Sequence, residues 1–242
     1  MQSPRPTETQ GNHDLFDAFR EPGCPICALT RRAVSHYMKS TNYEPVSYPD
    51  IRKLFVASQG FCNLHAHQWL EEAFVLGTAQ IYRDVLRATF DDLKGQSFKG
   101  RPLGKRIGAA LGRSGNAEGG LVGPSGPCPA CDVLEETETR LRKTLLSGLR
   151  DEEFRRAYAE SDGLCIPHLR GALVDAPDEQ VFEALKARAM RTRDTLLAHL
   201  DETVRKHDYR YRHEPAGEER GAPQRAVDHV ASAAGVTRRS PR

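Results

Sequence analysis

All six cysteines of this 242-residue chain fall in two short motifs, and each motif occurs twice. The first is Cys-Pro-x-Cys and the second is Cys-x-x-His. The eight residues are Cys24, Cys27, Cys62, His65, Cys128, Cys131, Cys165 and His168. Thiolate sulfur and imidazole nitrogen are the ligands that zinc prefers in closed tetrahedral sites. Their types and spacing therefore indicate metal binding, with three cysteines and one histidine for each ion.

The order of the motifs indicates a tandem duplication. In each copy Cys-Pro-x-Cys precedes Cys-x-x-His, with 34 residues between the motifs in the first copy and 33 in the second. Flanking positions also match, such as Gly60 with Gly163 and Phe55 with Tyr158. The simplest expectation is that each copy binds one Zn²⁺ with its own four ligands, which gives two ions per chain.

Other uses of these cysteines are weighed against zinc. An iron–sulfur cluster could take three cysteines and one histidine, and it stays open as an alternative. A dithiol redox motif of the thioredoxin type would follow a strand in a βαβ unit, and no such pattern is present. Cysteines that act only as small buried side chains would not explain the two matching histidines.

The ligands must be positioned by helices. Pro25 and Pro129 suit the first position of a helix, which places Cys24 and Cys128 at helix starts. Gly60 suits the left-handed conformation that ends a helix, and so does its counterpart Gly163. Helix N-termini that point at the sulfurs would stabilise thiolates through free N–H groups and the helix dipole.

The periodicity of apolar residues predicts an all-α fold. In 181–204 apolar side chains recur at three- and four-residue steps, as they do after both Cys-Pro-x-Cys motifs, and no segment alternates like a strand. We expect two tandem homologous helical units of about four helices each, pinned by a Cys3His site. The units are expected at 21–95 and 127–208.

The remaining segments are poor in apolar residues. Residues 1–20 and the basic tail 209–242 are expected to be disordered. Residues 96–126 are expected to form a flexible, basic, Gly-rich linker, because glycines at 104, 108 and 112 oppose a stable helix.

Composition restricts the location of the protein and its partners. No secretory signal and no apolar run of membrane-spanning length is recognised, so we expect a cytoplasmic protein without stable membrane association. In that reducing compartment, paired cysteines are metal ligands or redox centres more often than disulfides. The net charge of +2 is unevenly distributed, since residues 94–127 hold six Lys or Arg against one Glu. Nucleic acid could therefore bind this segment and the tail, although the motif-bearing segments are mildly acidic.

The two motif pairs resemble an uncharacterised bacterial family, known only as a domain of unknown function, whose members carry "GCPxC", a helical stretch and "GFCxxH". The resemblance covers roughly residues 21–95 and again 127–205, and the second copy reads "GLCIPH". It implies a metal-binding helical protein and carries no activity.

These observations favour a non-enzymatic protein with two structural zinc sites that binds a macromolecule, a protein first and nucleic acid second. No catalytic residue set is recognised. A thiol-based redox sensor or enzyme with labile metal-bound cysteines is the alternative. The oligomeric state is left open, and the long helix expected at 178–206 could support a dimer.

Overall fold

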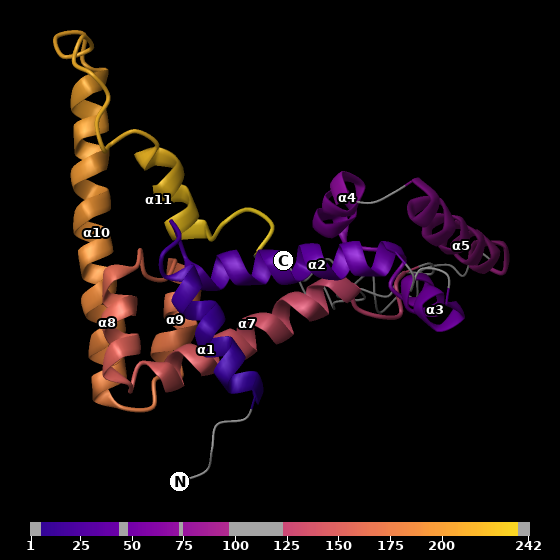
Figure 1. Cartoon of the computed structure of the whole chain (residues 1–242). Coiled ribbons are helices and arrows are strands. Elements are labelled where there is room, and N and C mark those ends of the chain that lie inside the picture. The colour runs from indigo at the N-terminus through magenta and orange to yellow at the C-terminus, as the bar shows by residue number, and fades with distance from the viewer. Residues whose placement is uncertain (1–5, 44–47, 73–74, 97–122, 237–242) are drawn as a thin grey trace, which may run out of the picture. The chain divides into compact units, whose positions relative to one another are not determined.

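A computed structural model describes residues 6–43, 48–72, 75–96 and 123–236, with side chains from residue 12 onward and, in the first range, through residue 42. In these ranges the chain forms ten helices and no strand, which confirms the all-α prediction (Figure 1). The helices are α1 (Pro6–Ala18), α2 (Pro25–Tyr43), α3 (Pro49–Ala57), α4 (Asn63–Glu72), α5 (Val75–Lys94), α7 (Pro129–Gly148), α8 (Glu152–Glu160), α9 (Ile166–Val174), α10 (Glu179–His207) and α11 (Ala222–Ala231). None of the described helices combines the length and the apolar character needed to cross a membrane.

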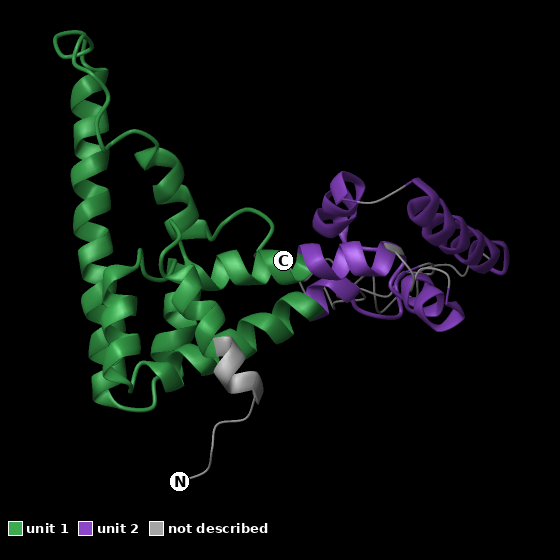
Figure 2. Ribbon diagram, in the orientation of Figure 1, with its two compact units in different colours: residues 1–34, 133–242 green, residues 35–132 purple. Residues whose placement is uncertain are grey.

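The helices belong to two compact units that differ from the expected tandem pair (Figure 2). Unit 1 comprises residues 1–34 and 133–242, and unit 2 comprises residues 35–132. The boundary falls within α2 and within α7, so each repeat contributes to both units. The division expected at 21–95 and 127–208 is thereby corrected.

Helix length explains the correction. α2 has 19 residues, which extend about 28 Å at about 1.5 Å per residue. The 9-residue α3 that precedes Cys62 extends only about 13 Å. The 20-residue α7 and the 9-residue α8 repeat this imbalance in the second copy. Each long helix therefore carries the chain away from its own Cys-Pro-x-Cys motif.

Unit 1 has a core of aliphatic and aromatic side chains. α10 contacts α8, α9 and α11, and α1 contacts α8. The side chains of Phe16 and Phe19 on and after α1 meet Phe154 of α8 edge to face, with ring centroids 5.0 and 5.1 Å apart. The buried residues are Leu15, Phe19, Ile26, Leu141, Leu145, Leu146, Leu149, Phe154, Tyr158, Leu164, Ala172, Val181 and Leu185.

Both termini are more ordered than expected. Within 1–20, residues 6–18 form α1, and Leu15 and Phe19 are buried in the unit 1 core. Within 209–242, α11 contacts α9 and α10, and Val236 is fully buried. The expectation of disorder was therefore wrong for 6–20 and for 209–236. Most of the predicted linker at 96–126, namely 97–122, lies outside the described residues, as do 1–5 and 237–242.

Unit 2 is built on a smaller aromatic core. α3 contacts α5, and Phe55 meets Phe61, which meets Trp69, with ring centroids 5.0 and 5.1 Å apart. The indole N–H of Trp69 donates a 3.0 Å hydrogen bond to the hydroxyl of Thr78. Because an unpartnered indole N–H is costly when buried, this bond lets the fully buried tryptophan serve as the centre of the unit.

Candidate metal centres

Every Cys-x-x-Cys or Cys-x-x-His pair stands at the start of a helix. The carbonyl groups of Cys24, Cys62, Cys128 and Cys165 each accept a hydrogen bond from the N–H group four residues later, at 2.8–3.2 Å. These cysteines are therefore helix caps, and the second ligand of each pair lies one turn further, on the same face. The predicted helix starts at Pro25 and Pro129 are confirmed. The two motif glycines are also left-handed as expected, with φ of +83° at Gly60 and +77° at Gly163.

The structure gathers all eight predicted residues into two groups, but each group combines one motif from the first repeat with one motif from the second. Cluster 1 consists of Cys24, Cys27, Cys165 and His168, and cluster 2 consists of Cys62, His65, Cys128 and Cys131. The first Cys-Pro-x-Cys motif thus joins the second Cys-x-x-His motif, and the reverse holds for cluster 2. The grouping by repeat expected from sequence order is wrong, because α2 and α7 separate the two motifs within each repeat.

Cluster 1 lies within unit 1, where the starts of α2 and α9 meet. Nδ1 of His168 lies 3.5, 3.4 and 3.1 Å from the sulfurs of Cys24, Cys27 and Cys165. The sulfurs of Cys27 and Cys165 are 3.7 Å apart. Three of the four ligands are buried, and only Cys24 is partly exposed.

Cluster 2 lies within unit 2, where the starts of α4 and α7 meet. Nδ1 of His65 lies 3.3, 3.6 and 3.4 Å from the sulfurs of Cys62, Cys128 and Cys131. The sulfurs of Cys62 and Cys131 are 3.7 Å apart. Here only His65 is buried and the three cysteines are partly exposed.

These distances fit the edges of one coordination tetrahedron. With Zn–S bonds of about 2.3 Å and Zn–N bonds of about 2.05 Å, tetrahedral angles place two sulfurs about 3.8 Å apart and a sulfur about 3.6 Å from a nitrogen. In the structure the Cys27–Cys165 and Cys62–Cys131 sulfur pairs are 3.7 Å apart, and each histidine Nδ1 lies 3.1–3.6 Å from the three sulfurs of its cluster. The donor set in each cluster can therefore hold a single metal ion.

The electrostatics of both clusters favour a cation at the centre. In cluster 1, hydrogen bonds from the Cys24 and Cys27 thiols lower the pKa of Cys165, whereas burial raises the pKa of Cys24. In cluster 2, a hydrogen bond from Cys131 lowers the pKa of Cys128 to about 3, and the pKa of Cys131 is raised by that same hydrogen bond and by burial. Sulfurs this close repel one another as thiolates, so three thiolates coexist only around a positive ion.

The two histidines differ in what holds the outer face of the ring. Nε2 of His168 lies 3.0 Å from a carboxylate oxygen of Glu138 on α7. Burial alone would lower the pKa of His168, but hydrogen bonds with Cys165, Cys27 and Glu138 raise it to about 11. A carboxylate in this position fixes the ring and directs Nδ1 at the metal.

Nε2 of His65, in contrast, is buried and has no hydrogen-bond partner among the described residues. Counted from the first cysteine of each motif, the repeat counterpart of Glu138 is Val34, whose side chain accepts no hydrogen bond. The histidine ring of cluster 1 is therefore held by a carboxylate, and the histidine ring of cluster 2 is not held in this way by any described residue.

The C-terminal segment covers cluster 1, which no sequence pattern had indicated. Val236 packs with Cys27 and Cys165, and the hydroxyl of Ser232 lies 3.2 Å from the sulfur of Cys165. Ser232 has a φ of +71°, an uncommon backbone conformation for a residue other than glycine. The contacts with cluster 1 come from 232–236, which carry no ligand motif, and their position follows only from the fold.

The histidine and the acidic residues that follow His65 on α4 lie outside the clusters. His67 and Glu71 are exposed on α4. Glu72 accepts a 2.8 Å hydrogen bond from Ser35 and pairs with Lys39 at 3.1 Å. None of these belongs to either cluster.

Comparison with known proteins places both clusters inside one family domain. The family described as "Family of unknown function (DUF6062)" matches residues 13–236, a single span that contains both copies of the motifs. A relative from Caldicellulosiruptor sp. (strain Rt8B.4), named "Uncharacterized 23.9 kDa protein in xynA 3'region", is 26% identical over 202 residues, covering 82% of this chain and 89% of that protein. No solved structure matches the chain.

Proposed function

The chain belongs to the DUF6062 family of unknown function, so we propose its role from the two clusters themselves. Each cluster binds one Zn²⁺, and each ion holds the helices of its own unit together as a structural centre. The observation that carries this proposal is the match between the donor distances of 3.1–3.7 Å and the edges of a zinc tetrahedron.

The compactness of each cluster favours a single ion over an iron–sulfur cluster. All four donor atoms lie within 4.8 Å of one another. In an iron–sulfur cluster the four protein ligands are distributed over two or four iron atoms with sulfide between them, so ligands on different irons lie further apart than ligands of one ion. The mixed donor set of three thiolates and one imidazole is also a common structural zinc set.

The saturated ligand set favours a structural role over catalysis. Four protein donors leave no coordination position for water or substrate, whereas catalytic zinc sites keep one open. Structural zinc contributes folding free energy, with apparent binding energies of about 10–16 kcal/mol in small domains. Unit 2, with its small aromatic core, would depend on this contribution most. A redox role of the thiols is the alternative, and it requires that the sulfurs react while the protein stays folded.

The test is the metal content of the full chain purified without added metal, with reactive thiols counted in parallel. We expect about two zinc ions per chain and thiols that stay unreactive until a chelator removes the metal. Iron with visible absorption, or no metal together with thiols that cycle between oxidised and reduced forms, would overturn the proposal.

We also propose that unit 2 binds a protein partner through α5. This helix exposes Leu86, Phe90 and Leu93 at four- and three-residue intervals, with Phe90 56% exposed, and Leu76 is exposed nearer its start. Exposed apolar side chains in such a row are typical of a helix that packs on another helix. A partner with an amphipathic helix fits this surface, and a protein fits it better than nucleic acid because the row is uncharged.

Light scattering of the wild type and of the double variant Leu86→Glu with Phe90→Glu tests this surface for self-association. A dimer that the variant converts to a monomer would identify a second copy as the partner. For a different partner, a protein captured by the wild type must bind again after purification, and the double variant must lose it. The matched control is Arg87→Glu, an exposed substitution on the same helix between the two apolar positions. Equal binding by all variants would contradict the role of α5.

A further inference from the structure

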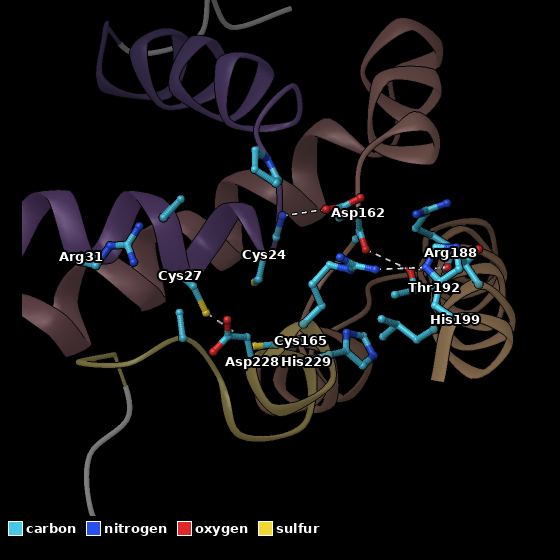
Figure 3. Close-up of a pocket in the computed structure, with 18 of the residues that line it drawn as sticks. Cys24, Cys27, Arg31, Asp162, Cys165, Arg188, Thr192, His199, Asp228 and His229 are labelled. Carbon is cyan, nitrogen blue, oxygen red and sulfur yellow. Dashed lines mark hydrogen bonds between the residues drawn. The ribbon is translucent and has the colours of Figure 1, made fainter. Parts of the chain in front are cut away.

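A cavity of about 660 Å³ opens beside cluster 1 within unit 1. Its lining comes from the starts of α2 and α9, the middle of α10, and α11 with the residues around it (Figure 3). We call it the arginine cavity, because Arg31, Arg188 and Arg225 line it. Its volume lies in the range of pockets that bind small molecules.

Arg188 is a cation without a bonded acceptor. Its Nε is buried, and it has no hydrogen-bond partner among the described residues. The side chain lies against Gly163, where a Cβ atom would come within 3.0 Å of the Arg188 Cγ. Burial lowers the pKa of Arg188, and the nearby charge of Arg191 adds to this effect. The side chain as a whole is partly exposed, and its buried Nε lacks the acceptor that buried polar atoms normally have.

Its neighbours on α10 are paired, so this is not a general property of the helix. Arg193 pairs with Asp194 at 2.6 Å, Arg205 pairs with Glu202 at 2.7 Å, and Arg191 donates to the carbonyl oxygen of Ala159 at 3.2 Å. Only Arg188 among these four arginines has neither a bonded carboxylate nor a bonded carbonyl in the described part of the chain.

The acidic residues of the cavity are directed to other groups. Asp162 accepts the Gly23 N–H at 2.7 Å and stabilises Arg188 only by its charge at longer range. Asp228 accepts a 3.1 Å hydrogen bond from Gln224. The side chain of Glu218 is 93% exposed and lies 3.6 Å from His199. None of the three forms an ion pair with Arg188 within the described residues.

The other two arginines of the cavity differ from each other. Arg225 already has acceptors within unit 1, because it donates to the carbonyl groups of Arg220 and Glu218 and contacts His199. Arg31 is exposed and makes no hydrogen bond or ion pair with the described residues. Figure 3 shows Arg31 beside Cys27, on the other side of the labelled cysteines from Arg188. Among the described residues, Arg188 and Arg31 are therefore the cavity arginines without an acceptor, one on each side of the labelled cysteines.

We propose that the arginine cavity binds a small organic anion whose carboxylate or phosphate group is held by Arg188. Planar guanidinium donors match both oxyanions in a bidentate arrangement. Ala28, Leu196 and Ala233 supply an apolar surface for the body of the ligand. The oxyanion lies at the Arg188 end, away from the thiolates of cluster 1, which would repel it.

The experiment is calorimetric titration of the metal-loaded full chain with two probes, inorganic phosphate and succinate, in a buffer without other oxyanions. We expect saturable binding of at least one probe, which identifies the phosphate or the carboxylate class. The variant Arg188→Gln should weaken this binding by about ten-fold or more, the loss expected when a charge-assisted hydrogen bond is removed. Arg193→Gln is the matched control on the same helix and should bind like the wild type.

Arg188→Lys protects the test against a folding defect, because it keeps the charge and most of the packing but loses the planar fork. It should bind more weakly than the wild type while melting at a similar temperature. No saturable binding of either probe at tens of millimolar, or equal binding by the wild type and both Arg188 variants, would overturn the proposal. The zinc content of each variant is measured separately, so a failure of the cavity proposal and a failure of the zinc proposal give different results.

Discussion

The exchanged ligand pairing predicts which cysteines depend on each other. Cys27 and Cys165 share cluster 1, with sulfurs 3.7 Å apart, whereas Cys62 belongs to cluster 2. Replacing Cys27 by Ser should remove one ion and leave about one zinc per chain. Adding Cys165→Ser should change nothing further, because both residues serve the same ion. Adding Cys62→Ser instead should leave essentially no bound zinc.

The same logic sets the size of the effect on stability. Two independent sites give additive changes in the free energy of unfolding, to within about 0.3–0.5 kcal/mol. For the pair in cluster 1, the second substitution acts on a site that is already empty. The interaction free energy should therefore approach the whole effect of one substitution, well above that scatter.

Zinc per chain by elemental mass spectrometry is the primary assay, and chemical denaturation measures the interaction free energy. Circular dichroism checks that each variant is helical, and the reciprocal set with Cys131→Ser and Cys62→Ser repeats the test on cluster 2. The reasoning fails if the variant with Cys27→Ser and Cys62→Ser keeps one zinc while the variant with Cys27→Ser and Cys165→Ser keeps none. That result would mean that each repeat closes its own site.

Three further predictions concern the surroundings of the sites. Glu138→Gln should weaken zinc binding at cluster 1 by about 10–100-fold, because the His168 ring loses its orienting carboxylate. Competition with a chelator measures the affinity, and zinc release at the wild-type chelator concentration would contradict the prediction. Gly60→Ala and Gly163→Ala should each lower the free energy of unfolding by about 1–2 kcal/mol, because both positions have positive φ. Denaturant unfolding tests this, and variants as stable as the wild type would show that backbone strain does not require glycine at these positions. Deleting 222–242 should speed alkylation of the cluster 1 thiols more than that of the cluster 2 thiols, because Ser232 and Val236 contact the cysteines of cluster 1. Peptide mass mapping follows the rates, and an equal change in both clusters would contradict that role.

Features that depend on near neighbours in the chain were predictable from the sequence. Helix starts at Pro25 and Pro129, the left-handed glycines and the helical period of α10 all follow from local backbone preferences. The eight ligands could be identified because the motif pair occurs twice. Apolar residues in "DLFDAF" of the N-terminal segment carried a helical signal that its low overall hydrophobicity obscured, and Leu15 and Phe19 are buried.

The grouping of the ligands could not be predicted from motif spacing. Both repeats have the same ligand types at the same spacing, so either pairing satisfies the motif. What decides between them is the length of the uninterrupted helix after each Cys-Pro-x-Cys motif compared with the short helix that follows. The cover over cluster 1 was unpredictable for another reason, since Ser232 and Val236 make contacts with residues far away in sequence.

The crossed pairing also determines the order in which the sites can be completed during synthesis. The ligands of cluster 2 span residues 62–131 and are nested inside those of cluster 1, which span 24–168. A ribosome that adds about 5–20 residues per second releases Cys27 on the order of ten seconds before Cys165, which follows 138 residues later. During that interval the nearest free donors are Cys62 and His65, and a loop about four-fold shorter is favoured by about 1 kcal/mol of closure entropy. On the proposed zinc sites, an ion captured early joins the wrong partners first, and the native sites form only when this ion is exchanged or arrives after the outer ligands have emerged.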